Sequence, residues 1–297
     1  MRIGLQLPSF RWPGGPEAVA PRLADVGQAA EGAGFSSLWV MDHLFQMPGD
    51  DWGGPEAPML EAYTTLGFLA RATSRIAIGP LVGAVHFRHP GHLIKAATTL
   101  DVLAGGRTYF GIGAGWYERE AVGLGIPFPS RRERYERLEE VLRLARSAWS
   151  GNTQPFEGRH YRLAEPILRP MPLARPRPPI MVGGNGPKRT MRLVAQYADA
   201  SNFGAPDPGE SRRLIEAIKR ACEAVGRDIA EIEMTSLIEV DLRPGRMSSA
   251  GVVARLRDQA DEGVQHVIVN MPDAHDLRYI EQFRREIIPE VAGLVPV

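Results

Sequence analysis

The pair Asp42 and His43 ends the stretch FSSLWVMDHLF, residues 35–45, whose apolar residues are otherwise typical of a buried strand. An imidazole titrates near neutral pH, so His43 could hydrogen-bond a cofactor ring or transfer a proton. A structural histidine, satisfied by a backbone carbonyl, would give the same local pattern. The position of this strand end in the fold decides between the two interpretations.

Two glycine-rich loops offer backbone amides to a flat or anionic ligand. In the first loop, residues 113–117, glycines would let a ligand approach the main chain, and aromatic residues could enclose it. The second loop, residues 183–186, precedes a predicted helix with Pro187 at its first position, and the positive end of such a helix suits a phosphate. Tight turns explain either loop alone, but the two together favour a phosphorylated cofactor. The candidate cofactor-binding positions are Gly113, Ala114, Gly115, Trp116, Tyr117, Gly183, Gly184, Asn185 and Gly186.

The segment AIGPLVGAVHFRHP combines a loosened strand with two histidines. Pro80 cannot donate to a strand ladder, and Gly79 and Gly83 weaken it, so we expect a bulge or kink there. His86 and His89 form an H-x-x-H pattern on a loop. Without a third ligand this pattern is a poor metal site, so we expect no metal.

Apolar runs alternate along the chain with segments of helical periodicity, which is typical of repeated βα units. The predicted strands are 2–8, 36–42, 75–83, 107–115, 179–184, 199–203, 231–240 and 266–271. The predicted helices are 17–33, 61–72, 90–104, 131–149, 187–197, 210–225, 248–261 and 275–291. This count favours one α/β domain over residues 1–297, a (β/α)₈ TIM barrel, over an open doubly wound sheet. The carboxyl ends of barrel strands meet at one mouth, which would gather Asp42, His43 and both glycine-rich loops.

Residues 150–178 break the repeat between helix four and strand five. They are dense in proline and contain the hairpin-like stretch FEGRHYRL. We therefore predict an insertion, which we expect to be a fixed wall rather than a moving lid.

The composition excludes several classes of protein. Lys and Arg together number 35, as do Asp and Glu, so there is no net field to attract nucleic acid or an anionic membrane. No run of about 18 apolar residues could span a bilayer, and the N-terminus lacks a secretory signal. The single cysteine, Cys222, excludes an intramolecular disulfide. We expect a soluble cytoplasmic protein.

The motifs taken together resemble the bacterial luciferase-like superfamily, and within it the oxidoreductases that use the deazaflavin coenzyme F420. The resemblance runs from residue 1 to about 203 through GLQLP, GFSSLWVMDH, EAYTTLGFLARATSRIAIG, FRHPGHLIKAATTLDVLAGGR, GIGAGW, RRERYERLEEVL, FEGRHY and PPIMVGGNGPKRTMRLVAQYAD. It implies a tricyclic ring in the barrel mouth, with His43 against the ring as the catalytic residue and Asp42 close by. It also implies a non-prolyl cis peptide bond around Val82 and Gly83 and places the cofactor's side chain and phosphate at the two glycine-rich loops.

The implied reaction is hydride transfer between the deazaflavin and a small organic substrate, with reduction of a C=C, C=N or C=O bond. His43 would give or take the proton or polarise the substrate. The family's sugar-phosphate dehydrogenases carry a glutamate where Trp116 stands, which argues against a sugar phosphate and for an apolar or aromatic substrate. The residues offered as walls of the mouth are Phe10, Trp12, Phe45, Trp52 and Trp116.

Three other functions stay open. One is an FMN-dependent monooxygenase of the same superfamily, which a partner reductase would supply with reduced flavin. Another is an aldolase or isomerase barrel, although Lys95, Lys188 and Lys219 lie in or beside helices, where none suits a Schiff base. The last is a silent binding subunit, against which the retained Asp42 and His43 argue. The relatives imply a homodimer.

Overall fold

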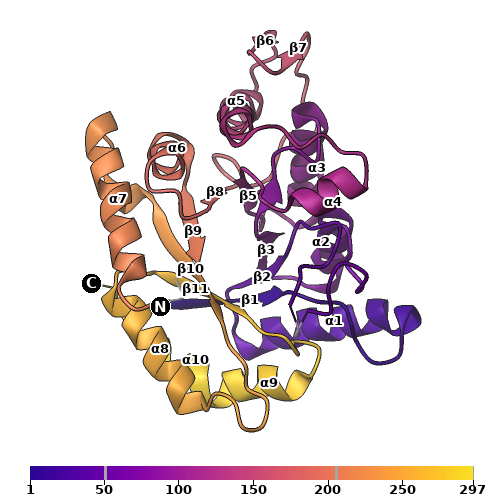
Figure 1. Cartoon of the computed structure of the whole chain (residues 1–297), viewed down its shortest axis with the longest axis vertical. Coiled ribbons are helices and arrows are strands. Elements are labelled where there is room, and N and C mark those ends of the chain that lie inside the picture. The colour runs from indigo at the N-terminus through magenta and orange to yellow at the C-terminus, as the bar shows by residue number, and fades with distance from the viewer. Residues whose placement is uncertain (50–51, 205–206, 297) are drawn as a thin grey trace.

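A computed structural model describes residues 1–49, 52–204 and 207–296 of the chain. Among these residues, nine parallel strands form one sheet in the order β3-β2-β1-β11-β10-β9-β8-β5-β4. Helices surround the strands, as Figure 1 shows. The strands of this sheet are β1 (Arg2–Leu7), β2 (Ser37–Val40), β3 (Ala77–Pro80), β4 (Gly83–Ala84), β5 (Phe110–Gly113), β8 (Ile180–Gly183), β9 (Ala200–Gly204), β10 (Glu233–Glu239) and β11 (His266–Asn270).

The sheet closes into a barrel through its third strand, which is split into β3 and β4. The second half, β4, pairs with β5 in the register Gly83 to Ile112. The first half is bridged from Ile78 to Thr108, just ahead of β5. The predicted strand 75–83 is therefore kinked where Pro80 and its glycines indicated, and the predicted (β/α)₈ barrel is confirmed.

Helices follow the strands at the predicted places, with three differences. The helices are α1 (Pro16–Ala33), α2 (Ala62–Ala72), α3 (Pro90–Leu103), α4 (Glu118–Gly123), α5 (Arg131–Trp149), α6 (Arg189–Tyr197), α7 (Glu210–Val225), η1 (Ile229–Glu231), α8 (Ser249–Asp261), α9 (Leu277–Gln282), η2 (Phe283–Ile287) and α10 (Ile288–Val291). Two short helices, α4 and η1, were not predicted, and the last predicted helix is interrupted by the π-helical segment η2. Pro187 does not open α6, because Lys188 is the cap residue and the helix begins at Arg189.

Helix α5 shows how sequence pattern becomes packing. Ser130 caps it by accepting a hydrogen bond from the amide of Glu133 at 3.3 Å. Its apolar stripe is buried, and the indole of Trp149 donates to the hydroxyl of Thr98 on α3 at 2.9 Å. On its outer side Arg137 forms an ion pair with Glu133, one turn earlier, at 2.7 Å. Glu139 pairs instead with a residue of α6, Arg192, at 2.6 Å.

The barrel has an inner and an outer core. The inner cluster lies inside the barrel, enclosed by the strands, and consists of Trp39, Leu81, Met181, Ala200 and Ile268. The outer core lies between the sheet and the surrounding helices. Side chains fill the interior of the barrel, so a ligand cannot enter it, and in this fold the functional site lies at the carboxyl ends of the strands.

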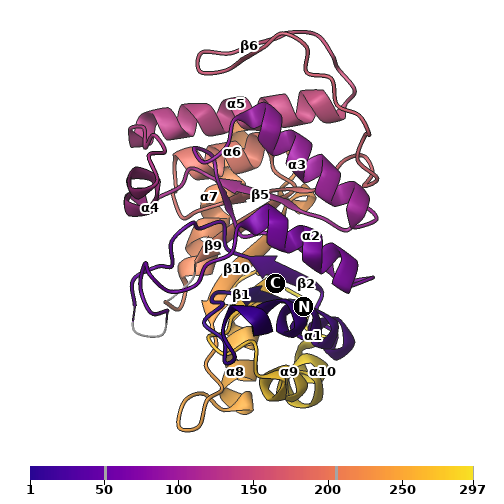
Figure 2. The ribbon, with the colours of Figure 1, turned by 90° about the vertical axis from the view of Figure 1, so that its right-hand side faces the viewer.

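The insertion carries the predicted hairpin, formed by β6 (Phe156–Glu157) and β7 (Arg162–Leu163). Figure 2 shows it beyond α5, on the outside of the molecule. The carboxylate of Glu140 on α5 accepts hydrogen bonds from the backbone amides of the hairpin turn, Arg159, His160 and Tyr161. These bonds tie the hairpin to α5.

Candidate active site

A cavity of about 320 Å³ occupies the mouth of the barrel at the carboxyl ends of β2, β4, β5, β8 and β9. Nine of the predicted site residues line it: Asp42, His43, Val82, Gly113, Ala114, Gly115, Trp116, Gly183 and Gly184. The structure adds eight residues that were not predicted: Leu81, Ala84, His86, Glu120, Tyr135, Asn202, Gly204 and Leu237. Of the described residues that line the cavity, none comes from the insertion 150–178.

Four predicted site residues lie beside the cavity rather than on its wall. Gly83 packs against the carbonyl of Gly111 on β5. Tyr117 stacks on Trp116 with ring centroids 5.2 Å apart. Asn185 exchanges hydrogen bonds with the backbone of Gly204, at 2.7 and 3.0 Å. Gly186, the fourth, lines a neighbouring hollow.

His43 is held by a residue that the sequence analysis missed. Its Nδ1 lies 2.7 Å from Glu120 Oε1, and the glutamate side chain is 1% exposed. The other oxygen, Oε2, accepts hydrogen bonds from the amides of Leu44 at 2.6 Å and Phe45 at 3.1 Å. A carboxylate can only accept, so the shared proton belongs to His43 Nδ1. The signal available in the sequence was an acidic residue soon after the strand-end loop, in GWYERE.

Asp42 forms an ion pair with an arginine that the sequence analysis did not identify as a site residue. Arg88 donates to both carboxylate oxygens of Asp42, at 2.7 and 2.8 Å, and to Glu61 at 2.5 Å. The amide of Ala84 donates to Asp42 as well, at 3.1 Å. Burial raises the pKa of Glu61, but hydrogen bonds from Thr64 and Arg88 outweigh it, so the pKa lies below its ordinary value. Asp42 therefore ties the end of β2 to β4 and supports the cavity wall.

His86 reaches the cavity with both ring nitrogens buried and without a hydrogen-bond partner among the described residues. Burial, with a smaller contribution from the Arg134 guanidinium, lowers the pKa of His86 to about 4, so the ring is neutral at pH 7. His89 has a different role, because its Nδ1 accepts from the amide of Gly91 at the start of α3. In the parts of the chain that the structure describes, no group of three or more metal-ligating side chains is found.

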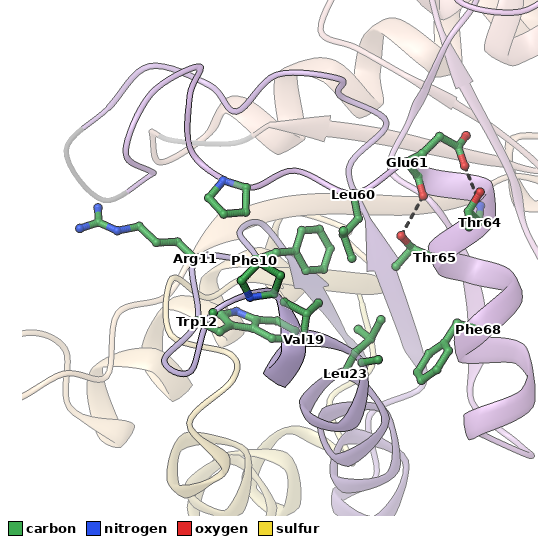
Figure 3. Close-up of a pocket in the computed structure, with 14 residues that line it drawn as sticks. Phe10, Arg11, Trp12, Val19, Leu23, Leu60, Glu61, Thr64, Thr65 and Phe68 are labelled. Carbon is green, nitrogen blue, oxygen red and sulfur yellow. Dashed lines mark hydrogen bonds between the residues drawn. The ribbon is translucent and has the colours of Figure 1, made fainter.

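Of the five aromatic residues expected as walls of the mouth, four do not line its cavity: Phe10, Trp12, Phe45 and Trp52. Phe10 and Trp12 line a separate, mostly apolar groove of about 510 Å³ between α1 and α2. Figure 3 shows Phe10, Trp12, Val19, Leu23 and Phe68 gathered there, with Glu61 at the rim. The expectation was wrong for these two because the loop after β1 places them against Val19 and Leu23 of α1. Trp116 does lie at the mouth, 60% exposed and 5.6 Å from the His43 ring.

The mouth fits a flat heterocycle that carries polar groups. A Cβ atom at Gly183 would lie 2.5 Å from Val82 Cγ2, so only glycine at this position leaves room for the Val82 side chain. Gly115 has φ near 72°, and a Cβ there would lie 2.4 Å from His86 Cε1. The ring nitrogens of His86, which lines the cavity and has no hydrogen-bond partner among the described residues, are free to bond a ligand. The peptide bond between Leu81 and Val82 is cis, as the resemblance implied.

The neighbouring hollow fits a phosphate. It has a volume of about 510 Å³ and shares Tyr135 with the mouth cavity. Its cationic side chains are Arg131, Arg132, Lys188 and Arg189. Helix α6 begins here, so its first amides and its positive end add to the attraction for an anion. A ligand with a ring in the mouth and a phosphate in this hollow would fit both.

Several known proteins are similar to this chain. The family model described as luciferase-like monooxygenase matches residues 1–285. An F420-dependent glucose-6-phosphate dehydrogenase of Nakamurella multipartita is 27% identical over 96% of this chain and 97% of its own length. An F420-dependent hydroxymycolic acid dehydrogenase of Mycobacterium tuberculosis is 34% identical over 70% of this chain and 55% of its own length.

A solved structure shows the same fold. The coenzyme F420 dependent tetrahydromethanopterin reductase of Methanopyrus kandleri superposes with a TM-score of 0.80 at 18% identity, over 97% of this chain and 98% of that one. Within the described residues, no helix has the length and apolar character needed to cross a membrane. The match to the family model covers nearly the whole chain, from the first strand to the segment η2. This chain belongs to the luciferase-like monooxygenase family.

Proposed function

We propose that the chain is a coenzyme F420-dependent oxidoreductase, which transfers a hydride between the deazaflavin and a small organic substrate. The observation that carries this proposal is the meeting of His43, Val82 and the first glycine-rich loop around one cavity, beside a cationic hollow. The F420-dependent relatives support the choice of cofactor. Reduction of a C=C, C=N or C=O bond is the reaction class that this arrangement suits.

The chain's own residues would bind and orient the cofactor. Val82 and Gly183 would face the ring, and His86 would offer it one hydrogen-bond donor and one acceptor. The hollow around Arg131 and Lys188 would take the phosphate. The bound deazaflavin would supply or accept the hydride.

His43 is the residue that we assign to the proton. It lines the mouth with its side chain 14% exposed, so a substrate can reach it. Its Nδ1 is engaged with Glu120, which leaves Nε2 to exchange a proton with the substrate. Asp42 has both oxygens bonded to Arg88 and is therefore a support rather than a proton carrier.

An apolar or aromatic substrate suits the rim of the mouth. Trp116 is 60% exposed there and stacks on Tyr117, which presents a flat apolar surface beside His43. One relative is named for hydroxymycolic acid, and others are named for glucose-6-phosphate. The Trp116 surface favours the apolar class over a sugar phosphate.

An FMN-dependent monooxygenase is the second candidate, because the family description names monooxygenases. In that case a partner reductase would supply the reduced flavin. For either cofactor we expect a homodimer in the cytoplasm, as the resemblance to the family implies. Light scattering during gel filtration tests the dimer, for which the expected mass is twice 32.6 kDa.

Equilibrium titration separates the two cofactors. The purified protein is titrated with F420 and, in parallel, with FMN, and quenching of the cofactor fluorescence is followed. We expect binding of F420 in the micromolar range or tighter, with FMN at least about tenfold weaker, which corresponds to about 1.4 kcal/mol. Micromolar binding of FMN without a response to F420, followed by oxygen uptake with reduced FMN, would replace our assignment with the monooxygenase.

A further inference from the structure

We propose that Glu120 is a positioning residue that fixes His43 in the tautomer protonated at Nδ1 and thereby leaves Nε2 as the atom that exchanges the proton. The kinetic part of this inference rests on the proposed function. The tautomer itself is a property of the protein alone. It is therefore measurable whatever the cofactor proves to be.

The hydrogen bonds of Glu120 fix the orientation of its carboxylate. The carboxylate is 1% exposed and accepts at both oxygens, from the amides of Leu44 and Phe45 on one side and from His43 on the other. A buried carboxylate needs such donors, because a buried charge without hydrogen-bond partners is strongly unfavourable. The two amides follow His43 directly along the chain, so the glutamate fixes the backbone and the ring together.

The contact to Nδ1 decides the chemistry at Nε2. Neutral imidazole carries one N–H, and the carboxylate accepts it from Nδ1, which makes Nε2 an acceptor that can take a proton. When the ring is protonated, Nε2 carries the proton that it can return, and the adjacent carboxylate stabilises the imidazolium. One contact therefore serves both directions of turnover.

Helix α4 carries Glu120 and lies directly behind the first glycine-rich loop. A Cβ atom at Gly123 of α4 would lie 2.9 Å from Phe45 Cε2, so the helix packs closely on the segment after His43. The His43 ring is also 5.6 Å from the ring of Trp116, which stands two residues before this helix begins. The cofactor loop and the proton-carrying residue are thus held by the same short element.

The experiment compares Glu120→Gln with Glu118→Gln, which changes an exposed glutamate on the same helix. Long-range ¹H–¹⁵N correlation spectra of the labelled protein report the tautomer, and the His43 signals are assigned by their loss in His43→Asn. We expect the Nδ1–H form in the wild type and in Glu118→Gln. In Glu120→Gln the amide oxygen stays with Leu44 and Phe45, so the NH₂ group donates to Nδ1 and the ring changes to Nε2–H.

Single-turnover rates with F420 provide the functional readout. For Glu120→Gln we expect hydride transfer to slow by roughly 10²-fold, the scale of a misplaced proton donor, and to approach the rate of His43→Ala. The F420 affinity should stay within about threefold, and Glu118→Gln should match the wild type. A merely structural glutamate would alter affinity and rate together without changing the tautomer.

Two results would overturn the proposal. One is an Nε2–H tautomer in the wild type, which needs no variant to be folded. The other is wild-type turnover in a Glu120→Gln protein whose tautomer has changed. Failure to bind F420 would contradict the proposed function instead, and the spectra would still decide the role of Glu120.

Discussion

At the scale of single residues, His266 shows how burial controls an imidazole inside the barrel. Its Nε2 lies 2.8 Å from the hydroxyl of Ser37 on β2, and its Nδ1 lies 3.1 Å from Glu233 on β10. Burial and then the charge of Arg2 lower the pKa of His266 to about 3, although Glu233 is its neighbour. The ring therefore stays neutral over the range in which an unfolded histidine gains a proton.

This low pKa makes folding depend on pH. The unfolded histidine titrates near 6.5, so below that pH the unfolded state binds a proton that the folded state does not. We expect His266 to lower the free energy of unfolding by about 1.4 kcal/mol per pH unit as pH falls from 6.5 toward 3. His266→Gln, which cannot titrate, should remove this part of the slope.

Urea unfolding at pH 7, 5.5 and 4.5 measures the effect. His92→Gln is the matched control, because His92 is exposed on α3 and should leave the slope as in the wild type. Equal slopes for the wild type and His266→Gln would contradict the assigned pKa.

The strand-end residues of the site were predictable one by one. Asp42, His43 and the glycines stand where a strand pattern stops, and the geometry of parallel strands places such ends at one mouth. Glu120 and Arg88 were not predictable in this way, because they reach the site from a helix and a loop. Their partners depend on side-chain direction, which the spacing of residues along the chain does not encode.

At the scale of elements, the split third strand and its neighbours form one wall of the mouth cavity. Val82 lies between β5 and β8, and Cβ atoms at Gly113 and Gly183 would lie 3.0 and 2.5 Å from its Cγ2 atom. A Cβ atom essentially never comes as close to another carbon as 2.5 Å, whereas 3.0 Å is tight but can be relieved by a small shift of Val82. The close spacing of strands around Val82 therefore depends most on glycine at position 183.

Gly183→Ala tests this wall. The added methyl group must displace Val82, and overpacking of this kind costs about 1 to 3 kcal/mol of stability. Because Val82 faces the cavity, we also expect F420 to bind at least about tenfold more weakly, as measured by fluorescence titration and a thermal melt.

Gly67→Ala is the control for this substitution. Gly67 lies in α2, and no described atom outside its own helix backbone lies within 4 Å of the position of the added Cβ. Alanine there should leave F420 affinity unchanged and raise stability by up to about 1 kcal/mol through helix propensity. Unchanged F420 affinity in Gly183→Ala would show that Val82 does not border the ring.

Most elements were predictable because their patterns are long and regular. Helix α5 combined an apolar stripe with a capping serine, and β11 was a run of β-branched residues. Helix α4 was missed because its six residues are too few to show a helical period. The split of the third strand was anticipated from Pro80, but its two separate partners, Thr108 and Ile112, depend on closure of the barrel.

At the scale of the whole molecule, the site exists because the barrel closes. The first strand pairs with the last, Arg2 opposite His266, and the terminal ammonium of Met1 donates to the carbonyl of Leu294 at 2.6 Å. Figures 1 and 2 both show the two ends of the chain close together. The number of βα units predicted a closed barrel, whereas the register of these long-range pairs could be known only from the structure.

We propose that the deazaflavin ring occupies the mouth between His43 and Val82, and a crystal structure of the protein with bound F420 is the decisive experiment. We expect the ring in contact with His43 and Val82 and the phosphate in the hollow formed by Arg131 and Lys188. A ring found instead in the apolar groove between α1 and α2, beside Trp12, would show that the mouth is not the cofactor site.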